Sequence, residues 1–204
     1  MDHLHRGQAG STASRRHKAQ THGILQEERP EGQMVNAMAE MMERVAQDGQ
    51  VQWIGLRPER RANLLPVAEV MADARGLIGD HAGARTRAVT LIQAEHLAAI
   101  GSYLGQGPVR PADLRRNIVV SGLNLDAMKG RRLKMGTAVL RLSRICSPCS
   151  RMEETFGPGG YSAVRGHGGW CAEVLDPGRI EVGSVVRPLP EPEPDDASPL
   201  DVPV

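Results

Sequence analysis

Two of the three cysteines of this chain, Cys146 and Cys149, lie three positions apart at the end of an alternating apolar run. Arg144 and Arg151 stand on either side of the pair. A thiol attacks a substrate or binds a metal as the thiolate, and a nearby guanidinium group favours that charged form. The segment therefore predicts cysteines that take part in chemistry.

The residues alone leave several uses of this pair open. Two cysteines with this spacing form the redox pair of thioredoxin-like proteins, although the strand-helix-strand context of those proteins is missing here. Cys146 and Cys149 could instead join His167 and Cys171 in a zinc site, because gaps of two or three residues between ligands are usual for tetrahedral zinc. A pair of buried cysteines without a function is the remaining interpretation, and the flanking arginines disfavour it.

Positive charge is concentrated in the same part of the chain. Residues 108–152 hold ten lysines and arginines against two aspartates, although the net charge of the whole chain is only +1. Such a patch attracts nucleic acid, a membrane surface or a phosphorylated small molecule. Because the chain has only five aromatic side chains on which bases could stack, we expect an anionic small molecule and no nucleic acid.

The cysteine count and the apolar pattern bear on the compartment. Three cysteines cannot all pair within one chain, and the sequence has neither a secretory leader pattern nor an apolar run long enough to span a bilayer. We therefore expect a cytoplasmic protein that keeps its thiols reduced and has no membrane partner.

The apolar pattern divides the chain into four parts. Residues 1–33 are polar, and we expect them to be disordered, whereas residues 34–47 have the spacing of an amphipathic helix. Residues 48–189 contain short apolar runs separated by turn signals, which is typical of a β domain. Residues 190–204 form an acidic, proline-rich stretch that we also expect to be disordered.

Short strands dominate the central part. They are predicted at residues 51–56, 64–71, 87–92, 118–120, 170–175 and 180–187, with one more that starts at Thr137 and leads to Cys146. A helix is predicted at 94–104, and a helical turn after Pro148. Because strands and helices do not alternate regularly, we predict a mostly β fold, a closed β-barrel with a few peripheral helices.

Two segments would present polar side chains to a site. Arg115, Arg116 and Asn117 directly precede an apolar strand, so a rigid element holds their donors in a fixed direction. The glycine-rich stretch 76–83 contains Asp80 and His81, which suit either a site or an ordinary turn.

Residues 51–189 resemble the MOSC domain, the module named after the C-terminal region of molybdenum cofactor sulfurases. Five motifs occur in the family's order, namely residues 76–80, 87–92, 114–122, the Cys146-Ser147-Pro148-Cys149 sequence, and the closing stretch 168–183. The resemblance implies a closed β-barrel, in agreement with the strand pattern, and it identifies residues 48–189 as a domain that binds molybdenum cofactor (molybdopterin).

The resemblance also implies residue roles. By similarity to the mitochondrial amidoxime-reducing members, Cys149 is expected to ligate molybdenum, while Arg115 and Asn117 are expected to contact the anionic pterin cofactor. A soft thiolate suits such a metal, and arginine suits phosphate oxygens. Cys146 would then be a neighbouring thiol, and the strand ends at Asn117 and Arg144 would have to lie close together.

The implied activity is that of an oxidoreductase that reduces N-hydroxylated or related substrates. An electron-donating reductase would be its partner, because no flavin or haem motif is visible. The alternative is a sulfur carrier or cofactor-handling protein in which Cys149 bears a persulfide. A structural zinc-binding protein is the second alternative.

Overall fold

The computed structural model describes residues 31–81 and 85–191. Most of the two segments that we expect to be disordered, residues 1–30 and 192–204, lies outside the described residues. The chain divides into two compact units, Met1–Met41 and Met42–Val204. Helix α1 (Glu31–Glu43) begins and ends earlier than the predicted helix at 34–47. All candidate site residues belong to the second unit.

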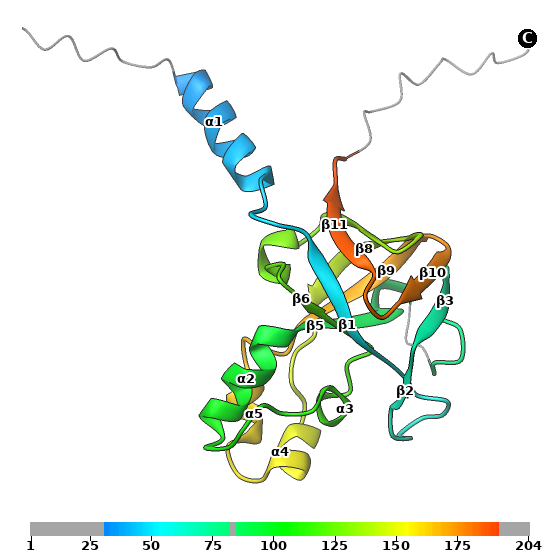
Figure 1. Ribbon diagram of the computed structural model, residues 1–204. Helices are drawn as coiled ribbons and strands as arrows, with labels where there is room; N and C mark the ends of the chain where they lie inside the picture. The colour runs from blue at the N-terminus through cyan, green and yellow to red at the C-terminus, as the bar shows by residue number, and fades with distance from the viewer. Residues whose placement is uncertain (1–30, 82–84, 192–204) are drawn as a thin grey trace, which may run out of the picture. The chain divides into compact units, whose positions relative to one another are not determined.

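A closed, mixed β-barrel forms the centre of the second unit (Figure 1). The strand order is β11-β7-β8-β9-β5-β6-β1-β2, and β11 also pairs with β1, so seven strands form a closed ring that β2 extends. Only β5 and β6 are parallel. The predicted closed, mostly β barrel is therefore confirmed. Its strands are β1 (Gly49–Leu56), β2 (Leu65–Val67), β5 (Val89–Gln93), β6 (Ile118–Ser121), β7 (Arg132–Met135), β8 (Ala138–Ile145), β9 (Trp170–Asp176) and β11 (Val185–Leu189).

A small second sheet lies beside the barrel, with the order β10 (Gly178–Glu181), β3 (Glu69–Asp73) and β4 (Gly76–Leu77). It explains two differences from the predicted strands. The run at 64–71 divides between β2 and β3, and the run at 180–187 divides between β10 and β11, because each run crosses from one sheet to the other.

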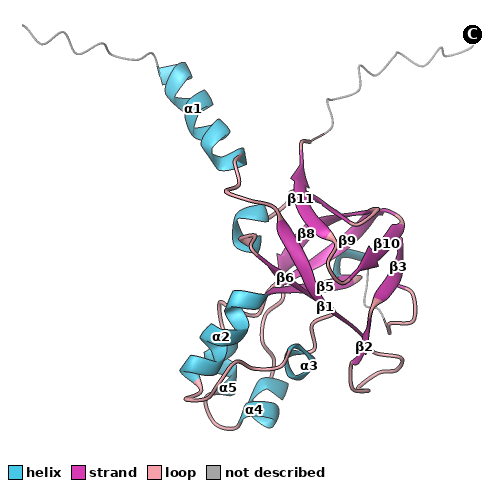
Figure 2. Ribbon diagram, viewed as in Figure 1, coloured by secondary structure: helices cyan, strands magenta, loops and turns pink. Residues whose placement is uncertain are grey.

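Short helices cover one side of the barrel (Figure 2). They are α2 (Ala94–Tyr103), α3 (Pro111–Leu114), α4 (Arg151–Phe156) and α5 (Gly160–Val164), with 3₁₀ turns η1 (Arg85–Arg87) and η2 (Leu125–Met128) elsewhere. A second apolar core that includes Ile92 of β5, Val119 of β6, Ile100 and Met152 packs beneath these helices. Because a core lies on each face, β5 and β6 are buried on both sides. Their sequences therefore do not alternate between apolar and polar residues. None of the described helices is both long and apolar enough to cross a membrane.

Candidate functional site

An arginine-rich cavity of about 480 Å³ opens where the loop after β8 meets the β1–β2 connection and the end of α3. Its wall contains Arg57, Arg60, Arg61, Arg115, Arg151, Cys149 and His81, and its acids are Glu59 and Glu154. Five guanidinium groups around one cavity attract an anionic ligand, because guanidinium donors match phosphate and carboxylate oxygens.

Cys149 reaches this cavity from the loop that follows β8. It is a free and exposed cysteine, and its carbonyl oxygen accepts a hydrogen bond from the backbone N–H of Met152 (2.9 Å) at the start of α4. The structure therefore brings Cys149 and Arg115, two of the three predicted site residues, to the same cavity.

Arg115 takes an unusual backbone conformation at the end of α3. Its φ is 59°, and Arg61 has a φ of 72°; in the described part of the chain no other residue except glycine has a positive φ. Each such conformation costs about 1–2 kcal/mol, and strain of this kind is found preferentially at binding and catalytic sites. Both strained residues line the arginine-rich cavity.

The positive charges around the cavity also repel one another. Burial lowers the pKa of Arg115, and the positive charges of Arg151 and Arg57 lower it further. Its Nη1 donates to the carbonyl oxygen of Ala62 (3.1 Å). An anion bound here would therefore relieve repulsion between guanidinium groups.

Asp80 holds one cavity arginine in place. The buried carboxylate of Asp80 accepts three hydrogen bonds from Arg57. The donors are the backbone N–H (2.6 Å), Nε (3.3 Å) and Nη2 (3.0 Å) of Arg57. The backbone N–H of His81 in turn donates to the carbonyl oxygen of Arg57 (2.5 Å). Of the two interpretations of the stretch at 76–83, the site interpretation is thus the better one, with Asp80 as a positioning residue.

Asn117, the third predicted site residue, does not line the cavity. Its side chain is fully buried, its Nδ2 donates to the carbonyl oxygen of Gly55 (3.0 Å), and its Oδ1 accepts from Thr90 Oγ1 (2.7 Å). These bonds join the ends of β1, β5 and β6. In the described structure Asn117 therefore connects strand ends behind the cavity.

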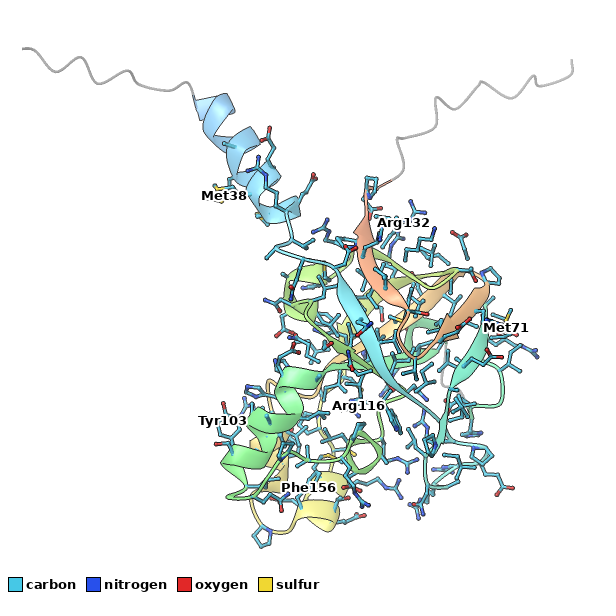
Figure 3. All side chains as sticks on the ribbon, viewed as in Figure 1. Met38, Met71, Tyr103, Arg116, Arg132 and Phe156 are labelled. Carbon is cyan, nitrogen blue, oxygen red and sulfur yellow. The ribbon has the colours of Figure 1, made fainter. Side chains whose placement is uncertain are left out.

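Arg116 is buried, unlike Arg115 before it. It is 6% exposed and donates to the carbonyl oxygens of Leu114 (2.6 Å), Gly168 (2.5 Å) and Cys146 (3.0 Å). Figure 3 shows Arg116 where the short helices meet the barrel. The expected approach of Asn117 and Arg144 is not seen, because β9 and β5 lie between β8 and β6 in the barrel. Only the long side chain of Arg116 reaches the loop after β8, at the carbonyl oxygen of Cys146, and Arg144 is exposed and does not line the cavity.

The four residues of the zinc alternative do not all come together. The ring of His167 packs against the rings of His96 and Tyr103 instead, with centroids 4.9 Å and 5.2 Å apart. Within residues 31–81 and 85–191 no group of three or more His, Cys, Asp or Glu is arranged to hold a metal ion. The predicted zinc site of Cys146, Cys149, His167 and Cys171 is therefore wrong.

Sequence reasoning missed the arginines of the β1–β2 connection. Arg57, Arg60 and Arg61 form a basic run between two predicted strands, which is the signal that could have marked them. They are far from Cys149 in the sequence, so the sequence did not indicate that they share a cavity with it. The neighbouring positions of β1 and β6 in the barrel bring this connection beside Arg115.

Comparison with known proteins identifies the fold. The MOSC domain profile matches residues 78–187, more than half of the chain. Three solved structures share the fold at 18–22% sequence identity: YUAD protein from Bacillus subtilis (TM-score 0.62, 18% identity, 69% of this chain and 94% of that one), YiiM from Geobacillus stearothermophilus (0.59, 22%, 70% and 75%) and YiiM from Escherichia coli (0.56, 21%, 70% and 71%). A search of the curated proteins found no match.

Proposed function

This chain belongs to the MOSC domain family, and from this premise we propose that it binds molybdenum cofactor in the arginine-rich cavity and acts as an oxidoreductase on N-hydroxylated or related substrates. The observation that carries the proposal is an exposed thiol, Cys149, in a wall that also contains five arginines. A soft ligand beside a strongly cationic surface suits a metal centre held by an anionic organic group.

The residues of the cavity fit such a group. Cys149 would be the protein ligand of molybdenum, and Arg115 and Arg151 would bind phosphate or carbonyl oxygens of the pterin. Asp80 keeps Arg57 directed to the same cavity, and Asn117 holds the strand ends behind it. When bound, the cofactor supplies two-electron redox chemistry at the metal, while these residues bind and orient it.

Electrons would have to come from a separate protein. The sequence has no flavin or haem motif, so we assign an electron-donating reductase as the partner.

The test is the molybdenum content of protein made in a host that synthesises the cofactor. We expect about one molybdenum per chain, and a large loss in Cys149→Ala, because a catalytic metal site depends on its protein ligands. Ser150→Ala is the matched control, since Ser150 lines the same cavity and offers no thiol. Equal molybdenum in wild type and Cys149→Ala would remove Cys149 as the ligand, and no molybdenum in any variant would overturn cofactor binding.

A sulfur carrier is the second candidate, because an exposed thiol among arginines also suits a persulfide. Cyanide releases such sulfur as thiocyanate. Sulfur released from wild type but not from Cys149→Ala, in protein without molybdenum, would favour the carrier. Molybdenum together with reduction of an N-hydroxylated substrate by a chemical electron donor would favour the oxidoreductase.

A further inference from the structure

We propose that Cys146 and Cys171 form an oxidation site, separate from the arginine-rich cavity, at which a peroxide converts the two thiols into a disulfide. Cys146 is the attacking sulfur and Cys171 the resolving one. The inference does not depend on the proposed function, because neither residue lines the arginine-rich cavity and no step involves a cofactor.

The barrel brings the two thiols together. Cys171 lies on β9 opposite Arg144 of β8, and the backbone N–H of Cys146 donates to the carbonyl oxygen of Gly169 (2.8 Å). Cys146 directly follows Ile145, which pairs with Trp170, so Cys146 lies beside the start of β9, close to Cys171. Both are buried and free, and each thiol shifts the pKa of the other.

Two arginines flank this thiol pair. The guanidinium of Arg116 is bonded to three backbone carbonyls, and in the described residues it has no carboxylate partner. Its positive charge favours the anionic form of the nearby Cys146 thiol. Arg87, from the 3₁₀ turn η1, is exposed and its positive charge acts on both thiols, which puts the pair close beneath the surface.

The thiolate belongs to Cys146. The hydrogen bond from Cys171 lowers the pKa of Cys146, and Arg116 and Arg87 lower it further, against the opposite effect of burial. The same bond and burial raise the pKa of Cys171. The pair therefore holds one nucleophilic thiolate and one protonated thiol, the arrangement that a two-step oxidation requires.

One molecule of hydrogen peroxide is sufficient to oxidise the two thiols to a disulfide. The Cys146 sulfur attacks one oxygen of hydrogen peroxide and the O–O bond breaks. Hydroxide leaves and takes a proton from solvent, which gives the first water. The sulfenic acid of Cys146 is then attacked by the Cys171 sulfur, which forms the S–S bond and releases the second water. Two electrons pass from the thiols to the peroxide.

Cys149 offers the competing disulfide, because its spacing from Cys146 also permits a bond. The structure favours Cys171: Cys149 lies exposed in the arginine-rich cavity, whereas Cys146 is buried against Cys171. The two outcomes differ in a tryptic digest. Cys146 and Cys149 share the peptide 145–151, and Cys171 lies in the peptide 166–179.

The experiment treats full-length reduced protein with hydrogen peroxide, blocks free thiols by alkylation, and maps the unreduced tryptic peptides by mass spectrometry. We expect peptides 145–151 and 166–179 to be cross-linked in wild type and in Cys149→Ser. In Cys171→Ser, Cys146 should accumulate as a sulfenic acid that reacts with dimedone. A disulfide confined to peptide 145–151, or no oxidation of Cys146 in Cys149→Ser, would overturn the proposal.

A rate measurement gives a second test with a variant that should fold normally. Arg87→Gln removes an exposed charge that favours the Cys146 thiolate, so the peroxide reaction should slow several-fold. Arg75→Gln is the matched control, because Arg75 is an exposed arginine whose described partner is Asp73. Equal rates for both variants would contradict a thiolate held by these arginines. Loss of molybdenum binding would leave both tests unaffected.

Discussion

Arg116 and Cys146 are coupled through charge. The pKa of the Cys146 thiol is lowered by the hydrogen bond from Cys171 and by the charge of Arg116, whose buried guanidinium donates to three backbone carbonyls and has no carboxylate partner in the described residues. A group whose pKa is lowered by folding stabilises the protein in its ionised form. The contribution to stability is present above the unfolded thiol pKa, about 8.5, and is lost as pH falls through the lower pKa of the folded state.

A pH series of urea unfolding curves tests this coupling. Cys146→Ser should lower the free energy of unfolding by about 3 kcal/mol at mildly alkaline pH, because it removes one partner of a buried charged pair. The difference from wild type should shrink as pH falls below the unfolded thiol pKa. Cys149→Ser is the control and should follow the wild-type pH dependence, since Cys149 is exposed. Parallel curves for wild type and Cys146→Ser would show that the sulfur carries no charge in the folded protein.

Residue types predicted part of the candidate site. Residue types marked the cysteine pair and the basic segment, and the family resemblance selected Cys149 and Arg115 within them. The buried position of Asn117 could not be predicted, because an amide serves equally well in a site or as a buried connector between strands. The distinction depends on Gly55 and Thr90, which are remote in sequence and meet Asn117 only in the barrel.

At the scale of elements, the turn between α5 and β9 controls how the cysteine loop meets the barrel. Gly169 has a φ of 79°, and a Cβ there would overlap the carbonyl oxygen of Leu91 on β5. Its own carbonyl accepts the N–H of Cys146. The close approach of three strands at this point therefore requires glycine.

Gly169→Ala should destabilise the protein by about 3 kcal/mol, the sum of left-handed backbone strain and overpacking. Gly166→Ala is a matched control, because Gly166 has a φ of 84° and open space where its Cβ would lie. It should cost only about 1 kcal/mol. Free energies of unfolding from urea titrations would separate the two, and equal losses would show that the overlap with β5 is relaxed without cost.

Strands with a clear apolar or alternating pattern were predictable as elements, and β7 was not. β8 and β9 have enough alternation to be recognised, whereas β7 has four residues, two of them basic, and reads as a connection. Its Leu133 and Met135 are buried only because β8 and β11 pair on either side. Helix α5 lies in a glycine-rich stretch, and its packing beside α4 rather than its propensity makes it helical.

At the scale of the whole molecule, β11 closes the barrel. It pairs with β7 along four residues and with β1 through Gly49 and Gln50, so it joins the two ends of the sheet. Val186 contributes a fully buried side chain to the barrel core. Without β11, both β1 and β7 would become open edges, and the core would be exposed on one side.

Two truncations at the C-terminus test this role of β11. Deletion of residues 185–204 should abolish cooperative thermal unfolding, because it opens the barrel and exposes a core shared by all its strands. Deletion of residues 192–204 alone keeps β11 and the Arg141–Glu191 ion pair, so the unfolding midpoint should stay within about 4 °C of the full chain, as expected for a change below 1 kcal/mol. Circular dichroism during heating measures both. A cooperative transition in the shorter truncation product, with residues 185–204 removed, would show that the remaining strands form a stable core without closure.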